Sequence, residues 1–342
     1  MALLMYAVIL IAAYYILDWI IHLPKIRNNG DKYIVVTGCD SGFGKLLALR
    51  LHQLGFHVFA SCLTEDGKNS LSEICSSRLI PTLLDLTNED SIYDFANFVN
   101  RTLPANTGIW ALVNNAGILG NIAQIDLLTK EDFSKVFNVN FLGIVEMTRS
   151  FLPLIRKSRG RIINMSSVNG RFGFLFTPYT VSKFAVEAFS DMLRREVYHE
   201  GIKVSILEPG AFKTDVMNVD RIMQQVQESV EKCEPETKHV YDTHFLDNLR
   251  RKFGVYCEFR SEEVHLVIEA YIHALTAKVP RSRYLIGWDG YFFGLVLSSL
   301  PDWAADIWLR IFFYILEIAM ARLHRMRLKN PNFFRKNTNS VE

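Results

Sequence analysis

The 342 residues suit a single large α/β unit with added segments at its ends. Apolar residues make up 49% of the chain and charged residues 22%, so a sizeable core can form. The 38 basic and 36 acidic residues leave a net charge of only +2, which excludes the strongly basic character of a nucleic-acid-binding protein. The five cysteines are scattered and form no Cys-x-x-Cys pair, which argues against a metal site or a disulfide framework.

The amino-terminal segment is almost entirely apolar. Between residues 2 and 23 the only fully charged side chain is Asp18, near the end of the stretch. About 20 apolar residues span a bilayer, so residues 1–24 are predicted to be a transmembrane anchor. A cleaved signal peptide is the alternative, but the stretch lacks a basic region before it and a small-residue cleavage site.

The charges that follow this segment predict its orientation. Lys25, Arg27 and Lys32 come directly after it, and the positive-inside tendency then places the rest of the chain in the cytosol. Asn100 begins an Asn-Arg-Thr glycosylation sequon, which could carry sugar only if the domain were lumenal. A second sequon, at Asn164, falls inside a predicted core strand and is expected to be silent.

Short apolar runs alternate with segments of helical period between residues 30 and 290. This alternation predicts an α/β fold, a doubly wound Rossmann-type parallel sheet of about seven strands with helices on both faces. The predicted strands are 33–37, 57–62, 79–84, 110–114, 161–165, 203–207 and 283–286, and the predicted helices are 43–54, 88–102, 130–157, 178–198 and 261–276.

A glycine-rich turn joins the first predicted strand to the first helix. Glycines there let backbone N–H groups approach a pyrophosphate, while the helix directs its positive end at the negative charge. The alternative is a glycine loop used only for close strand–helix packing. Asp85 follows the third strand and Asn114-Asn115-Ala116-Gly117 ends the fourth, which completes the predicted cofactor-binding residues at this end: Gly38, Asp40, Ser41, Gly42, Phe43, Gly44, Asp85, Asn114, Ala116 and Gly117.

The end of the second strand favours NAD over NADP. An NADP site usually has a basic residue beside the 2′-phosphate, and no arginine follows this strand. Glu65 and Asp66 would repel a phosphate nearby, and Ser41 occupies the loop position where a basic residue could sit.

Tyr179 and Lys183 lie four residues apart on a predicted helix and therefore share one face. A cationic lysine beside a tyrosine favours the phenolate, so the pair could exchange a proton with an alcohol during hydride transfer. Ser166 and Ser167 end the fifth strand, where a serine hydroxyl can orient the reacting oxygen. Alone, a Tyr-x-x-x-Lys is also compatible with an ordinary surface pair.

In this order, the glycine loop, Asn-Asn-Ala-Gly, the strand-end serines and Tyr-x-x-x-Lys resemble the classical short-chain dehydrogenase/reductase family over residues 32–288. The resemblance implies a catalytic tetrad of Asn140, Ser167, Tyr179 and Lys183, with Ser166 as the alternative serine. It also implies that Lys183 contacts the nicotinamide ribose, and that Pro209, Gly210 and Thr214 flank the nicotinamide.

A narrower likeness, to the retinol and hydroxysteroid dehydrogenase branch, rests on Thr37–Gly44, Ser61–Thr64, Phe184–Arg195 and Arg281–Asp289. It implies an NAD-preferring enzyme of the endoplasmic reticulum membrane that interconverts a lipophilic alcohol and its carbonyl compound, in contact with membrane lipid. The alternatives are a small hydroxy-acid dehydrogenase of the 3-hydroxybutyrate type and a non-catalytic membrane scaffold that retains the fold.

The remaining segments complete the predicted layout. Residues 211–260 break the α/β alternation and are a candidate substrate lid. Residues 291–329 are predicted to form a hydrophobic or amphipathic segment that lies on a membrane, packs on the protein or forms a dimer contact, and residues 330–342 a loose tail. Phe172, Phe174 and Phe176 are expected to pack in the core or to line a lipophilic pocket. Four charged residues of the helix that carries Tyr179 are expected to form a solvated face or a homodimer contact, namely Glu187, Asp191, Arg194 and Arg195.

Overall fold

A computed structural model describes residues 1–74, 77–173, 176–214, 217–258 and 260–329. The chain divides into two units, residues 1–294 and 295–342, which are described separately. The predicted tail at 330–342, like Phe174, lies outside the described residues.

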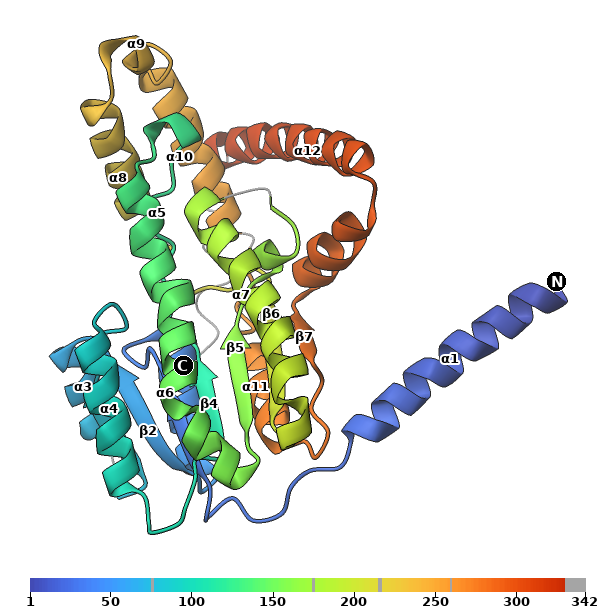
Figure 1. The fold of residues 1–342 in the computed structure, drawn as a ribbon. Coiled ribbons are helices and arrows are strands. Elements are labelled where there is room, and N and C mark those ends of the chain that lie inside the picture. The colour runs from blue at the N-terminus through green and yellow to red at the C-terminus, as the bar shows by residue number, and fades with distance from the viewer. Residues whose placement is uncertain (75–76, 174–175, 215–216, 259, 330–342) are drawn as a thin grey trace. The chain divides into compact units, whose positions relative to one another are not determined.

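The larger unit is built on a seven-stranded parallel sheet with the order β3-β2-β1-β4-β5-β6-β7 (Figure 1). The prediction of a parallel Rossmann-type sheet is therefore confirmed. Strand order reverses between β1 and β4, so the loops that follow these two strands diverge and leave a crevice at the carboxyl edge. The strands are β1 Tyr33–Val36, β2 His57–Cys62, β3 Leu79–Leu83, β4 Ala111–Asn114, β5 Arg161–Met165, β6 Lys203–Pro209 and β7 Arg283–Ile286.

Helices cover both faces of this sheet because the strands carry apolar side chains on each side. One core cluster joins the sheet to α2 (Gly42–Gln53), α3 (Glu65–Ser72) and α11 (His265–Thr276). The other joins it to α4 (Glu89–Thr102), α6 (Gly143–Ser158) and α7 (Thr177–Glu196). Burial of these two apolar layers supplies the main driving force for folding.

The predicted helix over 130–157 is interrupted in the structure. It consists of α5 (Lys130–Phe137), one π-helical turn (Asn138–Leu142) and α6. A π turn inserts an extra residue into the helical ladder and shifts the side chains that follow. Here the turn carries Asn140, whose side chain is completely buried.

The predicted lid contains three helices, α8 (Val219–Lys232), α9 (Pro235–Lys238) and α10 (Thr243–Glu258). The apolar face of α8 packs with Phe176 and with Phe253 of α10, so this segment has a small core of its own. Phe176 thus packs under the lid, beside the half-buried Tyr179.

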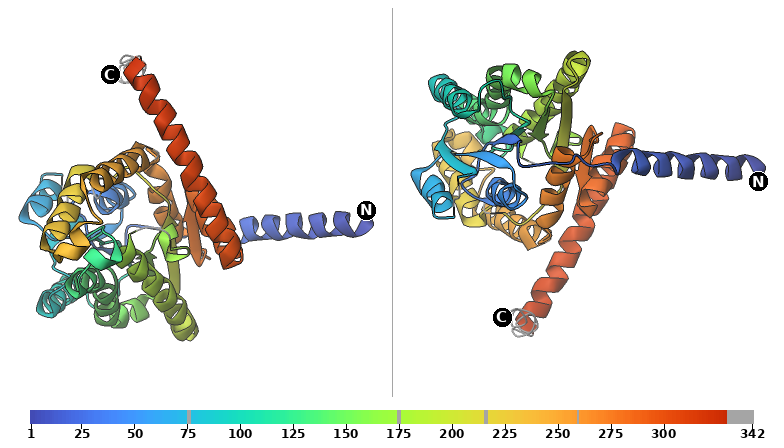
Figure 2. Two further views of the ribbon diagram at one scale, coloured as in Figure 1. Left: turned by 90° about the horizontal axis from the view of Figure 1, so that it is seen from above. Right: turned by 90° about the horizontal axis from the view of Figure 1, so that it is seen from below.

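The first helix, α1 (Ala2–His22), and α12 of the smaller unit (Asp302–Lys329) are each one continuous helix (Figure 2). In the part of the chain that the structure describes, no helix meets the length and apolarity required of a membrane span. Many large apolar side chains of α1 are nevertheless exposed, from Met5 to Ile21.

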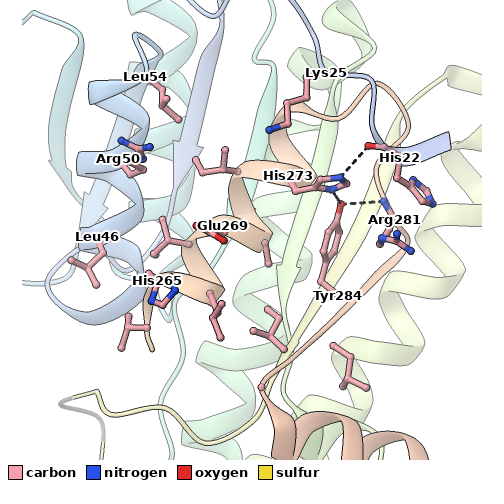
Figure 3. Close-up of a pocket in the computed structure, with 18 of the residues that line it drawn as sticks. His22, Lys25, Leu46, Arg50, Leu54, His265, Glu269, His273, Arg281 and Tyr284 are labelled. Carbon is pink, nitrogen blue, oxygen red and sulfur yellow. Dashed lines mark hydrogen bonds between the residues drawn. The ribbon is translucent and has the colours of Figure 1, made fainter. Parts of the chain in front are cut away.

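The segment between α1 and β1 is fastened to the end of α11. The backbone N–H of Ile26 donates to the Thr276 carbonyl oxygen at 2.7 Å, and that of Lys278 donates to Pro24 at the same distance. His273 hydrogen-bonds both the Tyr284 hydroxyl and the His22 carbonyl oxygen (Figure 3). The base of α1 is therefore held on the catalytic unit.

Candidate active site

A cleft of about 670 Å³ lies at the carboxyl edge of the sheet. Its walls come from the turn between β1 and α2, the ends of the central strands, the start of α7 and the lid. Most of the predicted site residues line it, namely Gly38, Asp40, Ser41, Gly42, Phe43, Asp85, Ala116, Gly117, Ser167, Tyr179, Lys183, Pro209, Gly210 and Thr214.

Tyr179, Ser167 and Lys183 meet in this cleft. The Tyr179 hydroxyl faces the Ser167 side chain, which favours the phenolate. The Lys183 ammonium lies 5.4 Å from the centre of the Tyr179 ring and donates to the Met165 carbonyl oxygen at 2.8 Å. The three predicted polar groups are thus close enough to act on one bound molecule.

The pKa of Tyr179 differs from the sequence-based expectation. Burial raises it above its ordinary value, and the hydrogen bond from Ser167 only partly opposes this effect. Burial also lowers the pKa of Lys183 to about 8, against the opposing charge of Glu187. The expected lowering of the tyrosine pKa by Lys183 is therefore not produced by the protein groups alone, because desolvation outweighs it.

The structure distinguishes the two strand-end serines. Ser167 faces Tyr179, whereas the Ser166 hydroxyl is fully buried beside Gly170 and Glu187, on the sheet side of α7. Consecutive residues at the end of a strand point in opposite directions, so only one of the pair can reach the tyrosine.

Asn140 lies beside the catalytic lysine and does not line the cleft itself. Its side-chain oxygen accepts from the Ile118 backbone N–H at 2.8 Å, and its amide donates to the Ile118 carbonyl oxygen at 2.9 Å and to Ser182 at 3.0 Å. These bonds fix the segment after β4 against α7. Asn140 therefore fixes the positions of Gly117 and Lys183 through their sequence neighbours, without lining the cleft.

Two glycines let the cofactor loop close tightly. Gly38 has φ +71°, and a Cβ there would lie 2.8 Å from the Ala116 backbone. Gly44 does not line the cleft; a Cβ there would lie 2.1 Å from the Gly38 carbonyl oxygen, so it allows α2 to pack on the loop. Both positions require glycine for close backbone approach.

Asn115 and Thr37 are functional residues that the sequence reasoning did not select. The Asn115 amide donates to the carbonyl oxygens of Thr37 at 2.9 Å and Gly38 at 3.2 Å, while the Thr37 hydroxyl accepts from the backbone N–H groups of Asn115 and Ala116. The adjacent Asn114-Asn115 pair was the signal in the sequence for this contact, but only Asn114 is selected from the sequence, as a cofactor-binding residue.

The Asn114 side chain does not line the cleft, and the prediction that this residue binds the cofactor stays a prediction. Its side chain is buried and donates to Asn164 at 2.9 Å, and Asn164 in turn donates to Ser190 of α7 at 2.8 Å. Asn114 still belongs to β4, where alternate side chains face the helices instead of the strand end. This chain of amides ties the sheet to α7.

At the adenine end, acidic side chains shape the loops. Both Asp40 oxygens accept backbone N–H groups, those of Leu63 and Thr64, each at 2.9 Å. The Asp85 carboxylate accepts from the Thr87 backbone N–H at 2.8 Å. Glu65 and Asp66 do not line the cleft; they begin α3, where acidic side chains favour the helix N-terminus.

Asp289 braces the loop that flanks the opposite end of the cleft. Its carboxylate accepts from the Ala211 backbone N–H at 2.5 Å, directly after Pro209 and Gly210. Burial raises the pKa of Asp289, and the backbone N–H groups around it oppose this. The Gly-Trp-Asp sequence was a usable signal for this contact.

A wider hollow of about 1300 Å³ lies between α2, α11 and the base of α1, and contains none of the predicted catalytic residues (Figure 3). Within the described residues, no group of three His, Cys, Asp or Glu side chains could hold a metal ion.

The cleft suits a dinucleotide, because the glycine turn exposes backbone N–H groups at the start of α2 and the central strands end beside it. Ser167, Tyr179 and Lys183 lie at the same edge, where a nicotinamide ring would place its reactive carbon. A Rossmann-type sheet with this cleft defines a nicotinamide-dependent oxidoreductase.

Comparison with known proteins agrees with this class. The short chain dehydrogenase family model matches residues 32–225. Mouse retinol dehydrogenase 7 is 42% identical over 302 residues, which cover 88% of this chain and 95% of that protein. Human 17-beta-hydroxysteroid dehydrogenase type 6 is 41% identical over 305 residues, with the same two coverages.

Solved structures show the same fold. A short-chain dehydrogenase from Streptomyces avermitilis has a TM-score of 0.63 at 25% identity, and covers 78% of this chain and 92% of its own. One from Burkholderia phymatum in complex with NAD has the same TM-score and coverages at 20% identity. The chain belongs to the short-chain dehydrogenase family, whose members use NAD or NADP, and it is an oxidoreductase.

Proposed function

We propose that this enzyme uses NAD to interconvert a lipophilic alcohol, a retinol or a hydroxysteroid, and the corresponding aldehyde or ketone. The single observation that carries the chemistry is the contact of Tyr179 with Ser167 beside the buried Lys183. The names of the similar proteins support the substrate class, as does the apolar cluster of the lid beside Tyr179. The small hydroxy-acid and scaffold alternatives have no comparable support.

NAD when bound supplies the hydride acceptor and a positive charge beside the tyrosine. Ser167 donates a hydrogen bond to the substrate oxygen and orients it. Tyr179 takes the hydroxyl proton during oxidation and returns it during reduction, and the Lys183 ammonium stabilises the phenolate. Gly38, Ser41 and the N-terminus of α2 would hold the pyrophosphate, and Pro209, Gly210 and Thr214 would flank the nicotinamide.

The preference for NAD rests on the loop after β2. Its cleft-lining side chains are Leu63 and Thr64, and neither they nor Ser41 can pair with a 2′-phosphate as a cation would. Measured dissociation constants for NADH and NADPH test this point, and tighter binding of NADPH would contradict it.

We propose further that α1 attaches the enzyme to the endoplasmic reticulum membrane with the catalytic unit in the cytosol. The exposed apolar side chains around α1 and the basic residues Lys25, Arg27 and Lys32 after it support this arrangement. Along α12, Trp303, Ile307, Ile311, Ile315 and Ile318 are exposed on one face, which supports a second contact with lipid.

Turnover assays test the proposed reaction. Purified enzyme with NAD and a panel of retinols, hydroxysteroids and 3-hydroxybutyrate should form NADH only with the lipophilic alcohols. Tyr179→Phe should lower kcat about 10²- to 10⁴-fold while NADH binding persists. Absence of turnover with every lipophilic alcohol by folded, NADH-binding enzyme would refute the proposal.

A further inference from the structure

A cluster of buried charges lies directly behind the catalytic lysine. Arg283 of β7 donates through one nitrogen to Glu187 of α7 and, at 2.6 Å, to Glu208 of β6. Its second terminal nitrogen donates to Asp191 at 2.9 Å. Glu208 is completely buried and Glu187 is 7% exposed, so the expected solvated or dimer face of α7 is wrong for Glu187: β7 covers it.

Glu187 and Lys183 share one face of α7, four residues apart. The Lys183 ammonium is 2% exposed, and its hydrogen bond to the Met165 carbonyl oxygen does not neutralise its charge. Glu187 is the carboxylate whose charge opposes the loss of the lysine proton. Neither Glu187 nor Arg283 lines the cleft, so neither can touch substrate or cofactor there.

Burial of these charges costs free energy that apolar packing of α7 on the sheet would not cost. Glu187 and Glu208 both bond Arg283, and Glu208 also accepts from Arg171 at 2.7 Å. Apolar side chains of similar volume often stabilise a buried site better than such ion pairs do. Burial and the neighbouring Glu208 raise the pKa of Glu187, while Ser166 and Arg283 oppose the rise. The ion pair with Arg283 favours the ionised carboxylate, which is the form that can stabilise the Lys183 ammonium.

We propose that Glu187, held by Arg283, is a positioning residue that keeps the Lys183 ammonium charged and thereby sets the upper pH limit of turnover. The inference rests on the proposed function, because it assumes that Tyr179 and Lys183 move the proton. The groups that face Glu187 are Ser166, which follows β5, Glu208 of β6, Arg283 of β7 and Lys183 of α7 itself. Glu208 is in turn paired with Arg171.

The test is the pH dependence of kcat/KM for Glu187→Gln, which keeps the shape of the side chain and removes its charge. Without that charge the pKa of Lys183 should be lower still, and the alkaline limb of the profile should move to lower pH by about one unit. Activity on the alkaline side would then fall about tenfold relative to wild type. Glu187→Asp, which restores the charge, should restore the wild-type limb.

Asp191→Asn is the matched control. Asp191 bonds the same arginine from the same helix, one turn farther from Lys183, so its loss should leave the alkaline limb in place. If Glu187 only fastens α7 to the sheet, Glu187→Gln and Asp191→Asn will both lower the melting temperature and scale kcat/KM evenly at all pH values. That result would overturn the proposal.

A binding titration separates this inference from the proposed function. NADH affinity, followed by nicotinamide fluorescence, should weaken as Lys183 loses its proton, and this loss should occur about one pH unit lower in Glu187→Gln. Wild type that binds NADH but oxidises no alcohol would refute the proposed function, and the titration would still decide the role of Glu187. Identical titrations for the two proteins would overturn the inference.

Discussion

Lys183 is a charged side chain that is almost completely buried, and this burial destabilises the folded state. Its pKa falls from the ordinary 10.5 to about 8 on burial, which corresponds to about 3 kcal/mol against the folded state at neutral pH. Lys183→Met should remove this term and lose the bond to Met165, worth about 1 kcal/mol. We expect the free energy of unfolding to rise by roughly 2 kcal/mol while turnover is lost.

The stability difference between Lys183→Met and wild type should depend on pH, and the pKa of Lys183 gives its direction. Between pH 8 and 10.5 the unfolded lysine holds a proton that the folded lysine has released, so wild-type stability rises with pH in this window. The advantage of Lys183→Met should therefore shrink as the pH is raised. Urea unfolding at pH 7 and pH 9.5 measures it, and a variant less stable than wild type at pH 7 contradicts the assignment.

The two strand-end serines should differ in their effect on catalysis. Ser167→Ala removes the hydroxyl that contacts Tyr179 and should lower kcat on the order of 10²-fold, as expected for the loss of a donor to the reacting oxygen. Ser166→Ala removes a hydroxyl turned toward Glu187 and should retain most of kcat at neutral pH. Equal losses in both variants would contradict this division.

At the scale of residues, sequence spacing identified Tyr179 and Lys183 as neighbours because a helix brings i and i+4 together. It left Ser166 as an alternative to Ser167, and it selected Asn114 without Asn115, since each choice depends on where a strand ends and in which direction its last side chain points. Both decisions need the register of β5 and β4. Tertiary contacts also buried Glu187, which its sequence neighbours gave no reason to expect.

Among the elements, α2 can pack on the cofactor loop only because residue 44 is a glycine. Gly44→Ala should favour the helix intrinsically, yet its Cβ would lie 2.1 Å from the Gly38 carbonyl oxygen and displace the cofactor loop. We expect weaker NADH binding and a lower melting temperature. Gly254→Ala in α10 is the matched control: no atom lies within 4 Å of its Cβ, so it should stabilise the protein by about 0.5–1 kcal/mol.

The strands were predictable as elements because buried parallel strands are continuous apolar runs bounded by polar residues. The break in the predicted 130–157 helix was not, since its apolar period continues through Asn138–Leu142 and the π turn satisfies contacts made by Asn140. The lid helix α8 left a readable signal. Ile222, Met223, Val226 and Val230 follow a helical period, although residues 211–260 were identified from the sequence only as a candidate lid, with no helix predicted there.

For the whole molecule, the proposed membrane attachment predicts that membrane binding can be removed while alcohol oxidation is kept. An enzyme lacking residues 1–21 should float with liposomes much less than the full chain, because it loses the exposed apolar surface of α1 and keeps only the proposed lipid contact of α12. It should still oxidise a lipophilic alcohol delivered in detergent, since none of the removed residues lines the cleft. Flotation and NADH formation measure the two properties, and undiminished flotation would assign attachment elsewhere, with α12 the first candidate.

The fastening of Pro24 and Ile26 to Thr276 and Lys278 limits how far such a truncation can go. A protein that started at Lys32 would strip the hydrogen-bond partners from the end of α11 and the turn that follows it, and so leave the Thr276 carbonyl oxygen and the Lys278 N–H without these partners. The practical starting point for a soluble, crystallisable version is therefore His22, whose carbonyl oxygen meets His273.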